Sequence, residues 1–478
     1  SWRAARWSVR RFCWRSLCRV SGGSGMKPLM VLGCTSDAGK SLLVTALCRW
    51  FARAGVDVAP FKAQNMSNNA RVVAGGEIGV AQWLQAKAAG VEPDVRMNPV
   101  LLKPEADTQS QVVVRGRVDR GLSETAWSQR HDALWTPMSE SFDELVAEHE
   151  LVIIEGAGSP AEINLRDQVN NRMIEHADAV GLLVSDIDRG GSFAHLYGTW
   201  ALVPDTTRER LDGYVLNRFR GDADLLAPGP ERLTELTGMT LAGVVPMVSH
   251  QLPREEGGVE RSTAPAGAPR VVIPRLPYGS NLDEFQLLST VASIRWATAG
   301  SDFDGLEPTT DLIVLPGSKH VVADLDWIRG RGIDDAVIGA VDRGVRCVGV
   351  CGGAMMLGRS IDDRHGVEGG RPLRCDGLGL LDHTTVLGST KTTALVEVDA
   401  LGARFSGYEI RYGELTDGRR YISDGRVTAT TVHGLFEHPE FLRRLLAVDV
   451  TPVLDDTFEL LADTIDQHLD TTWLQSIL

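Results

Sequence analysis

The sequence predicts an α/β protein with two doubly wound domains, each with a mainly parallel sheet, joined by a polar linker. In both halves short apolar runs alternate with helical patterns, which is typical of a parallel sheet with helices on its faces. Glycine-containing turns follow several of these runs, where such sheets bind ligands. Residues 251–269 carry charges, Pro and Gly without periodicity, which indicates a linker. We therefore expect domains at 26–250 and 270–478, because 478 residues exceed one ordinary core.

Composition and charge exclude two classes of partner. The formal net charge of -14 disfavours non-specific nucleic-acid binding, which depends on Lys and Arg neutralising phosphates. No apolar run reaches the roughly 20 residues that a membrane helix needs. The seven Cys have no paired spacing, which favours a reducing, cytoplasmic compartment over a disulfide framework.

Residues 1–25 differ in composition from the rest of the chain. They carry six Arg and no acid, and a Gly/Ser tract leads to Met26. This composition resembles a transit peptide, and an extension upstream of the functional start explains it equally well. We expect the fold to begin at Met26 and residues 1–25 to be a disordered extension.

A phosphate-binding loop is expected near the start of the first domain. An apolar run at 28–33 precedes CTSDAGKS and a helical pattern, so that Gly39, Lys40 and Ser41 open a helix. Backbone N–H groups of such a loop cradle phosphates, the Lys adds a positive charge, and the Ser hydroxyl can hold Mg²⁺. Five residues separate Gly33 from Gly39, one more than the strict motif allows. The spacing is similar to that of dethiobiotin synthetase-like enzymes.

Polar clusters follow three further apolar runs. The run at 151–154 ends in Glu155, the run at 180–184 in SDIDRGG, and the run at 213–217 in RFRGD. An acid at the carboxyl end of a core strand is well placed to hold Mg²⁺, which makes Glu155 a candidate metal ligand. Taken singly, each acid or amide is more often a turn or helix-cap residue. Four such clusters after four strands favour one shared ligand site.

The chain resembles the cobyric acid synthase family from about Pro28 to the C-terminus. The resemblance rests on APFKAQNMSNN (59–69), GGEIGVAQ (75–82), MNPVLLKP (97–104), EGAGSPAEINLRD (155–167), DIDRGG (186–191) and NRFRGD (217–222). It implies an ATP-binding amidoligase domain followed by a class I glutamine amidotransferase domain. By this resemblance, ATP activates the b, d, e and g carboxylates of (adenosyl)cobyrinic acid a,c-diamide as acyl phosphates, and ammonia from glutamine replaces the phosphate.

The same resemblance implies a set of ligands and the residues that hold them. The ligands are ATP, Mg²⁺, glutamine and a corrinoid, without a tightly bound prosthetic group, and a homodimer is compatible with it. The expected nucleotide contacts are Asp37, Gly39, Lys40, Ser41 and Asn217. The expected corrinoid contacts are Lys62, Gln64, Asn65, Asn164 and Asp186. Ser41 and Glu155 are the expected metal ligands.

Cys351, on a predicted turn, is the candidate nucleophile of the second domain. A run of small and β-branched residues at 345–350 leads to Cys351, two glycines follow, and an apolar helical stretch comes next. In such a strand, turn and helix, the next N–H and the helix N-terminus face the reacting carbonyl and can hold an oxyanion. From this turn alone, a buried structural Cys is an equal alternative.

Two further stretches of sequence favour a nucleophilic Cys351 over a structural one. The segment DLIVLPGSKH (311–320) ends a strand in a turn whose Gly317 or Ser318 N–H could join that of Gly352 at the oxyanion. The segment GRVTATTVHGLF brings a β-like run to His433, the expected base. A Cys on one turn and a His after a later strand resemble the class I glutamine amidotransferases.

The chain departs from the family pattern in three places. Class I triads usually place a Glu two residues after the His, but Glu437 comes too late, so a Cys and His pair is expected. The family's Cys-Gly-Gly-Tyr-Gln run ends here in Ala354 and Met355, which puts glutamine binding in question. The stretch at 166–171 looks shorter than the family's run of alternating Arg and Asp, which leaves Asp167 as the stand-in for a missing acid.

Two alternative functions are open from the sequence. A phosphate-loop regulatory ATPase with a non-catalytic second domain is disfavoured by the presence of Cys351, Gly352 and His433. The cobyrinic acid a,c-diamide synthase shares the architecture, but KAQNMSNN and EINLRD resemble the cobyric acid branch.

Overall fold

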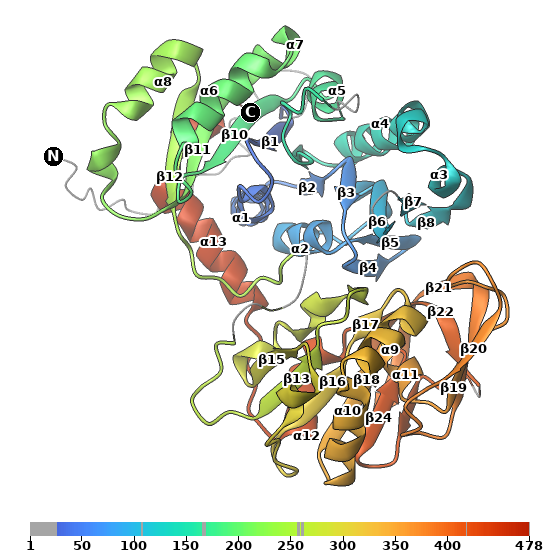
Figure 1. The fold of residues 1–478 in the computed structure, drawn as a ribbon. Helices are drawn as coiled ribbons and strands as arrows, with labels where there is room; N and C mark the ends of the chain where they lie inside the picture. The colour runs from blue at the N-terminus through green and yellow to red at the C-terminus, as the bar shows by residue number, and fades with distance from the viewer. Residues whose placement is uncertain are drawn as a thin grey trace.

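Figure 1 shows the computed structural model, which describes residues 26–477 apart from 107–108, 165–168, 256–258, 260–261 and 417. Two domains, each built on a mainly parallel sheet, confirm the expected fold class. The extension at 1–25 lies outside the described residues. Within the described ranges, no helix has the length and apolar character needed to cross a membrane.

Six parallel strands form the sheet of the first domain, in the order β12-β11-β10-β1-β9-β2. Their bounds are β1 Leu29–Gly33, β2 Val58–Phe61, β9 Leu151–Glu155, β10 Val180–Asp186, β11 Leu211–Phe219 and β12 Thr240–Pro246. Along β1, Leu29 and Val31 pack into one core, and Met30 and Leu32 pack into the core on the opposite face. A strand buried on both faces needs a continuous apolar run, which explains the sequence LMVLG.

Helices cover both faces of this sheet. They are α1 Lys40–Arg53, α2 Val80–Ala89, α3 Arg120–Glu124, α4 His131–Glu148, α5 Val169–His176, α6 Ser192–Leu202, α7 Asp205–Arg208 and α8 Gly229–Thr237. Apolar residues of α1 and α2 belong to the core on one face, and those of α4, α5, α6 and α8 to the core on the other. The doubly wound arrangement leaves the carboxyl ends of the strands open for ligands.

Between β2 and β9 the chain builds two small sheets on the side of the second domain (Figure 1). One sheet contains β3 Gln64–Met66, β6 Val100–Ala106, β7 Gln109–Val114 and β8 Arg117–Asp119. The other is the hairpin of β4 Ala70–Val73 and β5 Gly76–Gly79. This hairpin contacts the long strands of the second domain, and Gln111 of β7 reaches them as well.

The second domain has a six-stranded sheet in the order β15-β13-β16-β18-β24-β23, parallel except for β23. The strands are β13 Arg270–Pro274, β15 Ser293–Ala297, β16 Leu312–Leu315, β18 Arg346–Val350, β23 Tyr421–Ser423 and β24 Val427–Thr430. Its helices are α9 Val321–Gly330, α10 Ile333–Asp342, α11 Gly352–Met356 and α12 Pro439–Leu446.

A four-stranded sheet extends this domain toward the first. It contains β19 Ser360–Asp363, β20 Leu373–Asp376, β21 Thr384–Ala400 and β22 Ala403–Leu415. The long antiparallel pair β21 and β22 contacts β4 of the first domain. A short bridge of β14 Gly279–Ser280 and β17 Gly317–Ser318 joins two loops at the same side. The contact between the domains is therefore made largely of strands.

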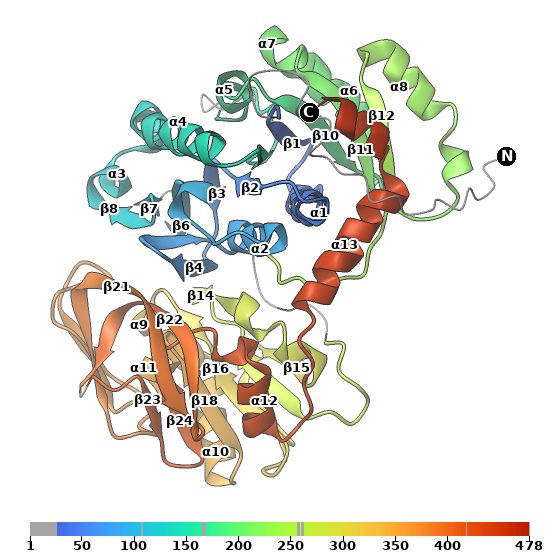
Figure 2. The same ribbon diagram turned by 180° about the vertical axis from the view of Figure 1, so that it is seen from behind.

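The two C-terminal helices pack in a different domain from the one that the sequence predicts for them. Helices α13 Leu454–His468 and α14 Thr471–Ile477 do not stay with the domain expected at 270–478. Figure 2 shows α13 running along α1, and apolar side chains of both C-terminal helices lie in the core of the first domain. Arg53 on α1 makes ion pairs with acids of α13, among them Asp463 at 2.6 Å. Side-chain periodicity predicts a helix but does not reveal which of two cores receives it.

Candidate active sites

The phosphate loop connects β1 to α1, as the sequence predicts. Gly39 caps α1 with a φ of 95°, a conformation that favours glycine. A Cβ at Gly39 would lie 2.1 Å from Nδ2 of Asn217, so a larger residue does not fit. Asn217 Nδ2 donates a hydrogen bond of 2.9 Å to the Ala38 carbonyl and holds the loop closed. Asn217 thus supports the loop from the end of β11.

Lys40 lies at the start of α1, where its ammonium is close to the phosphate loop. Burial lowers the pKa of Lys40, and the carboxylate of Glu155 opposes this change. Lys40 Nζ lies 3.4 Å from the Thr35 carbonyl within the loop. The first N–H groups of a helix have no partner inside the helix and attract anions, especially beside a Lys. The arrangement fits the phosphates of a nucleotide.

Glu155 lies at the carboxyl end of β9 and is 2 % exposed. It accepts hydrogen bonds from Ser41 Oγ at 2.8 Å and Gln85 Nε2 at 2.5 Å, and pairs with Lys62 Nζ at 2.9 Å. Burial raises the pKa of a carboxyl, but Lys62 lowers that of Glu155 below its ordinary value. Glu155 is therefore an ionised carboxylate beside the loop hydroxyl.

Glu255 also reaches this cluster, from the segment expected to be only a linker. Its carboxylate lies 3.0 Å from Lys62 Nζ and accepts a hydrogen bond of 3.3 Å from Ser41 Oγ. Its backbone carbonyl accepts hydrogen bonds from Ser67 Oγ at 2.8 Å and Asn69 Nδ2 at 3.2 Å. The site therefore contains a second carboxylate that the sequence did not reveal, because Glu255 follows no strand and belongs to no motif.

The donors in this cluster fit Mg²⁺. Ser41, Glu155 and Glu255 supply a hydroxyl and two carboxylates, the hard oxygen ligands that Mg²⁺ prefers. Mg²⁺ usually takes few protein ligands and completes its shell with phosphate oxygens and water. Within the described residues no group of three or more His, Cys, Asp or Glu could hold a metal by itself. The cluster suits a metal that arrives with a nucleotide.

Asp37 and Asp186 form one ion-pair network at the strand ends. Arg218 donates to Asp37 Oδ1 at 3.0 Å and to Asp186 Oδ2 at 2.9 Å, and Arg189 lies 2.9 Å from Asp37 Oδ2. Burial raises the pKa of Asp37, but Arg218 and Arg189 lower it below its ordinary value. The acids meet beside the phosphate loop as expected, while their roles as ligand contacts stay predictions.

The other expected corrinoid contacts differ in their burial and in their partners. Lys62 is buried beside Glu155, and Asn65 is buried and donates to Gln82 Oε1 at 3.1 Å. Gln64 is half-buried on β3, and Asn164 is exposed. Asp167 lies outside the described residues. A substrate role for these residues stays a prediction.

Cys351 occupies the expected turn between β18 and α11. Its φ is 50° and its ψ is -106°, an unusual conformation for a residue with a side chain. The Cys351 N–H donates to the Thr430 carbonyl at 2.7 Å, which fixes the turn against the end of β24. Cys351 is 3 % exposed and lines a small cavity. A strained turn that presents a sulfur to a cavity favours the nucleophile over a structural Cys.

His433 lies beside Cys351, and Glu284 orients it. His433 Nδ1 is 2.8 Å from Glu284 Oε1, and Glu284 Oε2 accepts the Gly434 N–H at 3.0 Å. Cys351 lies close enough to the imidazole to act on its charge, while its Sγ donates to the Ile410 carbonyl at 3.7 Å. Burial lowers the pKa of an imidazole, yet Glu284 and Cys351 raise that of His433 to about 10. These three side chains have the geometry of a nucleophile, base and orienting acid.

Glu284 corrects the expected Cys and His pair. It lies in the short helix Leu282–Phe285, far before His433 in the chain, and is fully buried. The later acid Glu437 is instead an ion-pair partner of Arg71. No spacing in the sequence connects residue 284 with residue 433, so only the fold reveals the third group.

The expected oxyanion donors surround Cys351. Gly352 opens α11, whose first N–H groups have no helical partner. A Cβ at Gly352 would lie 2.7 Å from the Ser318 nitrogen, so the two turns approach too closely for any other residue. Gly317 is on the same strand as Ser318, and a Cβ at Gly317 would lie 2.9 Å from Cε1 of the His433 ring. Assignment of these N–H groups to an oxyanion stays a prediction.

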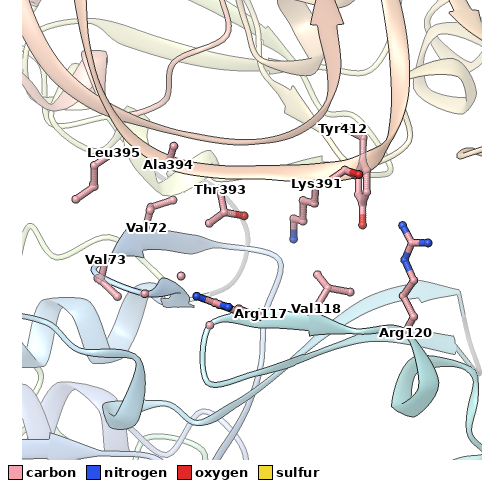
Figure 3. A pocket seen from close by; sticks show the side chains of 14 residues that line it. Val72, Val73, Arg117, Val118, Arg120, Lys391, Thr393, Ala394, Leu395 and Tyr412 are labelled. Atoms are coloured by element: carbon pink, nitrogen blue, oxygen red, sulfur yellow. The ribbon is translucent and has the colours of Figure 1, made fainter.

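The cavity at Cys351 has a volume of about 70 Å³ and is lined by both domains. Met355, 2 % exposed, packs toward β22, since a Cβ at Gly413 would lie 2.5 Å from its sulfur. Lys391 and Tyr412 line this cavity and also a larger one between the domains, of about 570 Å³ (Figure 3). The nucleophile therefore lies next to the interdomain space.

Comparisons with known proteins agree with this geometry. The family description "CobQ/CobB/MinD/ParA nucleotide binding domain" matches residues 29–256, and "CobB/CobQ-like glutamine amidotransferase domain" matches residues 270–441. A cobyric acid synthase of Polaromonas naphthalenivorans (strain CJ2) is 47% identical over 95% of this chain and 99% of that protein. One of Variovorax paradoxus (strain S110) is 49% identical over 94% of this chain and 99% of that protein. Because nearly the whole length of each relative is matched at this identity, the chain is a glutamine-dependent amide ligase and belongs to the cobyric acid synthase family.

Proposed function

We propose that this chain amidates the b, d, e and g carboxylates of (adenosyl)cobyrinic acid a,c-diamide to give (adenosyl)cobyric acid, using ATP and glutamine. The observation that supports this most is the presence of two sites in one chain. One site combines Cys351, His433 and Glu284, and the other combines a phosphate loop with Glu155. Free ammonia is mostly protonated at neutral pH, so an enzyme that makes amides gains from releasing it next to the acceptor.

In the glutaminase half, His433 accepts the Cys351 proton, and the thiolate attacks the carboxamide carbon of glutamine. The resulting oxyanion is held by the Gly352 N–H and by an N–H of Gly317 or Ser318. The C–N bond then breaks, and His433 returns its proton to the nitrogen that leaves as ammonia. Water attacks the thioester with His433 again as base, which releases glutamate and restores the thiol.

In the synthetase half, the loop N–H groups and Lys40 hold the ATP phosphates. A carboxylate of the corrinoid attacks the terminal phosphorus, ADP leaves, and ammonia displaces phosphate from the acyl phosphate to give the amide. Mg²⁺, held by Ser41, Glu155 and Glu255, would neutralise charge on the phosphates. Lys62 lies between the two carboxylates and adds a second cation at this end of the sheet.

The larger interdomain cavity is our candidate for part of the corrinoid site, although none of the expected corrinoid contacts Lys62, Gln64, Asn65, Asn164 and Asp186 lines it. Figure 3 shows Arg117 and Arg120 from the first domain facing Lys391 from the second, with Val72 and Leu395 among the apolar lining. Lys391 is already paired with Glu77 at 2.5 Å, so Arg117 and Arg120 are the two cations that, beside apolar side chains, suit a large, partly apolar macrocycle with several carboxylates. Lys391 and Tyr412 line both this cavity and that of Cys351, so the two cavities are neighbours, which supports a short path for ammonia.

The corrinoid assignment predicts a selective effect of Arg117→Ala. The KM for the corrinoid diamide should rise about 10-fold, because an ion pair or charged hydrogen bond to a carboxylate is lost. Glutamate release should not change. The control is Arg232→Ala, since Arg232 makes an exposed ion pair with Glu235 on α8. An unchanged KM in Arg117→Ala would move the corrinoid site elsewhere.

The proposed reaction is tested by incubating the purified chain with ATP, Mg²⁺, glutamine and either cobyrinic acid or its a,c-diamide, and measuring product masses. Amidation of the diamide supports the proposal. Amidation of cobyrinic acid that stops at the diamide would identify an a,c-diamide synthase instead. ATP hydrolysis without glutamate release would favour the regulatory ATPase. A homodimer stays a prediction that light scattering of the same sample checks.

A further inference from the structure

Arg71 belongs to the first domain, where its guanidinium lies 5.5 Å from the centroid of the Trp83 ring, but its hydrogen-bond and ion-pair partners belong to the second domain. It lies on β4 and is 3 % exposed. Its Nη1 donates a hydrogen bond of 2.6 Å to the Tyr408 hydroxyl, and its guanidinium lies 5.2 Å from the centroid of the Tyr408 ring. Nη2 pairs with both Asp283 and Glu437. A buried Arg with three polar partners in the other domain makes specific contacts across the interface and does more than cover surface.

Each of these three partners adjoins the glutaminase site. Asp283 precedes Glu284 in the helix Leu282–Phe285, and Glu437 ends the short helix that follows His433 and Gly434. Tyr408 stacks on the His433 ring with centroids 5.4 Å apart and 20° between the planes. The backbones of Tyr408 and His433 also exchange two hydrogen bonds, of 2.9 and 3.2 Å. Arg71 thus touches every segment that carries the imidazole and its orienting acid.

The positive charge of Arg71 compensates the negative charges of the acids around it. Burial raises the pKa of Asp283, and Arg71 acts in the opposite direction. Glu437, whose side chain is 32% exposed, is a second acid in contact with Arg71. Asp283 has no exposed side-chain surface, and Glu284 lies directly beside it in the chain. Carboxylates gathered in a buried region repel one another unless a cation compensates them. Without Arg71, these acids would be expected to separate or take up protons, and the helix that holds Glu284 would shift.

A second contact from the same strand acts on the same helix. The Ala70 N–H donates to Asn281 Oδ1 at 3.1 Å, and both groups are buried. Asn281 precedes the helix Leu282–Phe285 and has a φ of 54°. Strand β4 therefore holds the start of this helix through the Ala70 N–H, and it holds Asp283 of the same helix through Arg71.

We propose that Arg71 is a positioning residue for the glutaminase site, supplied across the interface by the nucleotide-binding domain. It holds Tyr408 against His433 and neutralises the acids around Glu284, so the glutaminase geometry is complete only when the domains are docked. The inference rests on the proposed role of Cys351, His433 and Glu284. It adds a dependence of glutamine hydrolysis on a residue that belongs to the other active site's domain.

The test compares glutamate release from glutamine with amide formation from ammonium salt, in the full-length chain. In Arg71→Ala the kcat of glutamine hydrolysis should fall about 10- to 100-fold, the effect of a small misplacement of catalytic groups. The KM for glutamine should change little, because Arg71 does not line the Cys351 cavity. Ammonium-dependent synthesis should continue at the wild-type rate.

Conservative and double variants separate positioning from general destabilisation. Arg71→Lys keeps the charge and should restore part of the lost kcat. Tyr408→Phe keeps the stacked ring but removes the acceptor of the 2.6 Å hydrogen bond, and should add little further loss in the Arg71→Ala background. Arg53→Ala, which removes ion pairs between α1 and α13 within the first domain, is the control for loss of an Arg ion pair away from the glutaminase site and should leave both activities unchanged.

Equal loss of both activities in Arg71→Ala, or unaltered glutamine hydrolysis, would overturn the inference. Cys351→Ala distinguishes this from failure of the proposed function. If Cys351→Ala stops glutamine hydrolysis and Arg71→Ala does not, only the role of Arg71 is wrong. If Cys351→Ala still hydrolyses glutamine, the glutaminase assignment is wrong and the inference falls with it.

Discussion

At the scale of single residues, the charge of His433 is set by its two partners. A buried imidazole by itself prefers the neutral form. The Glu284 carboxylate at 2.8 Å and the Cys351 sulfur reverse this preference and raise the pKa of His433 to about 10. At neutral pH the imidazole can therefore keep the proton that it takes from the thiol, and can return it to the departing ammonia.

We predict that Glu284→Gln lowers kcat/KM for glutamine hydrolysis on the order of 10²-fold, a typical contribution of acid–base catalysis. A carboxylate beside the imidazole raises its pKa, so a neutral amide in its place lowers that pKa. The basic limb of the pH profile, where the imidazolium loses its proton, should move to lower pH. Rates of glutamate release measured across pH check this shift.

The same preparation should make amide from ammonium salt at the wild-type rate. Glu284→Asp, which keeps the charge, should retain the position of the basic limb better than Glu284→Gln. A Glu284→Gln profile that matches wild type in height and position would show that the Cys and His pair works without a third group.

At the scale of elements, the segment between the domains contributes to a site. Leu252 packs in the core of the first domain and Val259 in that of the second, with Glu255 between them at the phosphate loop. The polar composition that predicts a linker is correct for a connection on the surface. It does not reveal that the carbonyl of Glu255 is held by Ser67 and Asn69.

We predict that Glu255→Gln weakens binding of Mg²⁺-ATP about 10-fold, because an amide is a poorer metal ligand than a carboxylate. Calorimetric titration with ATP in the presence of Mg²⁺ measures this loss. Binding of ATP with chelator present should change little. Glu231→Gln, at an exposed position of α8, is the control for removal of one negative charge. Equal weakening with and without Mg²⁺ would assign Glu255 to a structural role.

A second element, the stretch from Lys62 to Arg71, extends from one site to the other. At its start Lys62 pairs with Glu155 and Glu255 beside the phosphate loop. At its end Arg71 reaches the acids beside His433. Ten residues of continuous chain thus contact both reaction centres. This connection gives a physical reason why glutamine hydrolysis and ATP use can depend on each other.

At the scale of the whole molecule, the chain crosses between the domains twice. Residues 251–269 lead from the first sheet to the second, and α13 returns to pack beside α1 (Figure 2). The hairpin of β4 and β5 also contacts the long strands β21 and β22 of the second domain. The two cavities that border the interdomain region have Lys391 and Tyr412 in common, and the smaller one contains Cys351.

The sequence predicts much of this organisation because several of its signals are local. The strands that end at Gly33, Glu155 and Asp186 are apolar runs, and all of them lie in the parallel sheet as expected. The turn at Cys351 is likewise encoded by its neighbours. Glu284 could not be found in this way, because its partner His433 is distant in the chain and no periodic pattern joins them.

One measurement tests most directly the claim that the chain carries two separate sites. Amide formation is measured with glutamine and with ammonium salt, and glutamate release is recorded in parallel, for Cys351→Ala and Lys40→Ala. Cys351→Ala should lose glutamine-dependent synthesis and glutamate release but keep ammonium-dependent synthesis, because only the thioester route is removed. Lys40→Ala should lose synthesis with either nitrogen source and still release glutamate. Glutamine-dependent synthesis by Cys351→Ala, or equal loss of both routes in that variant, would contradict the account.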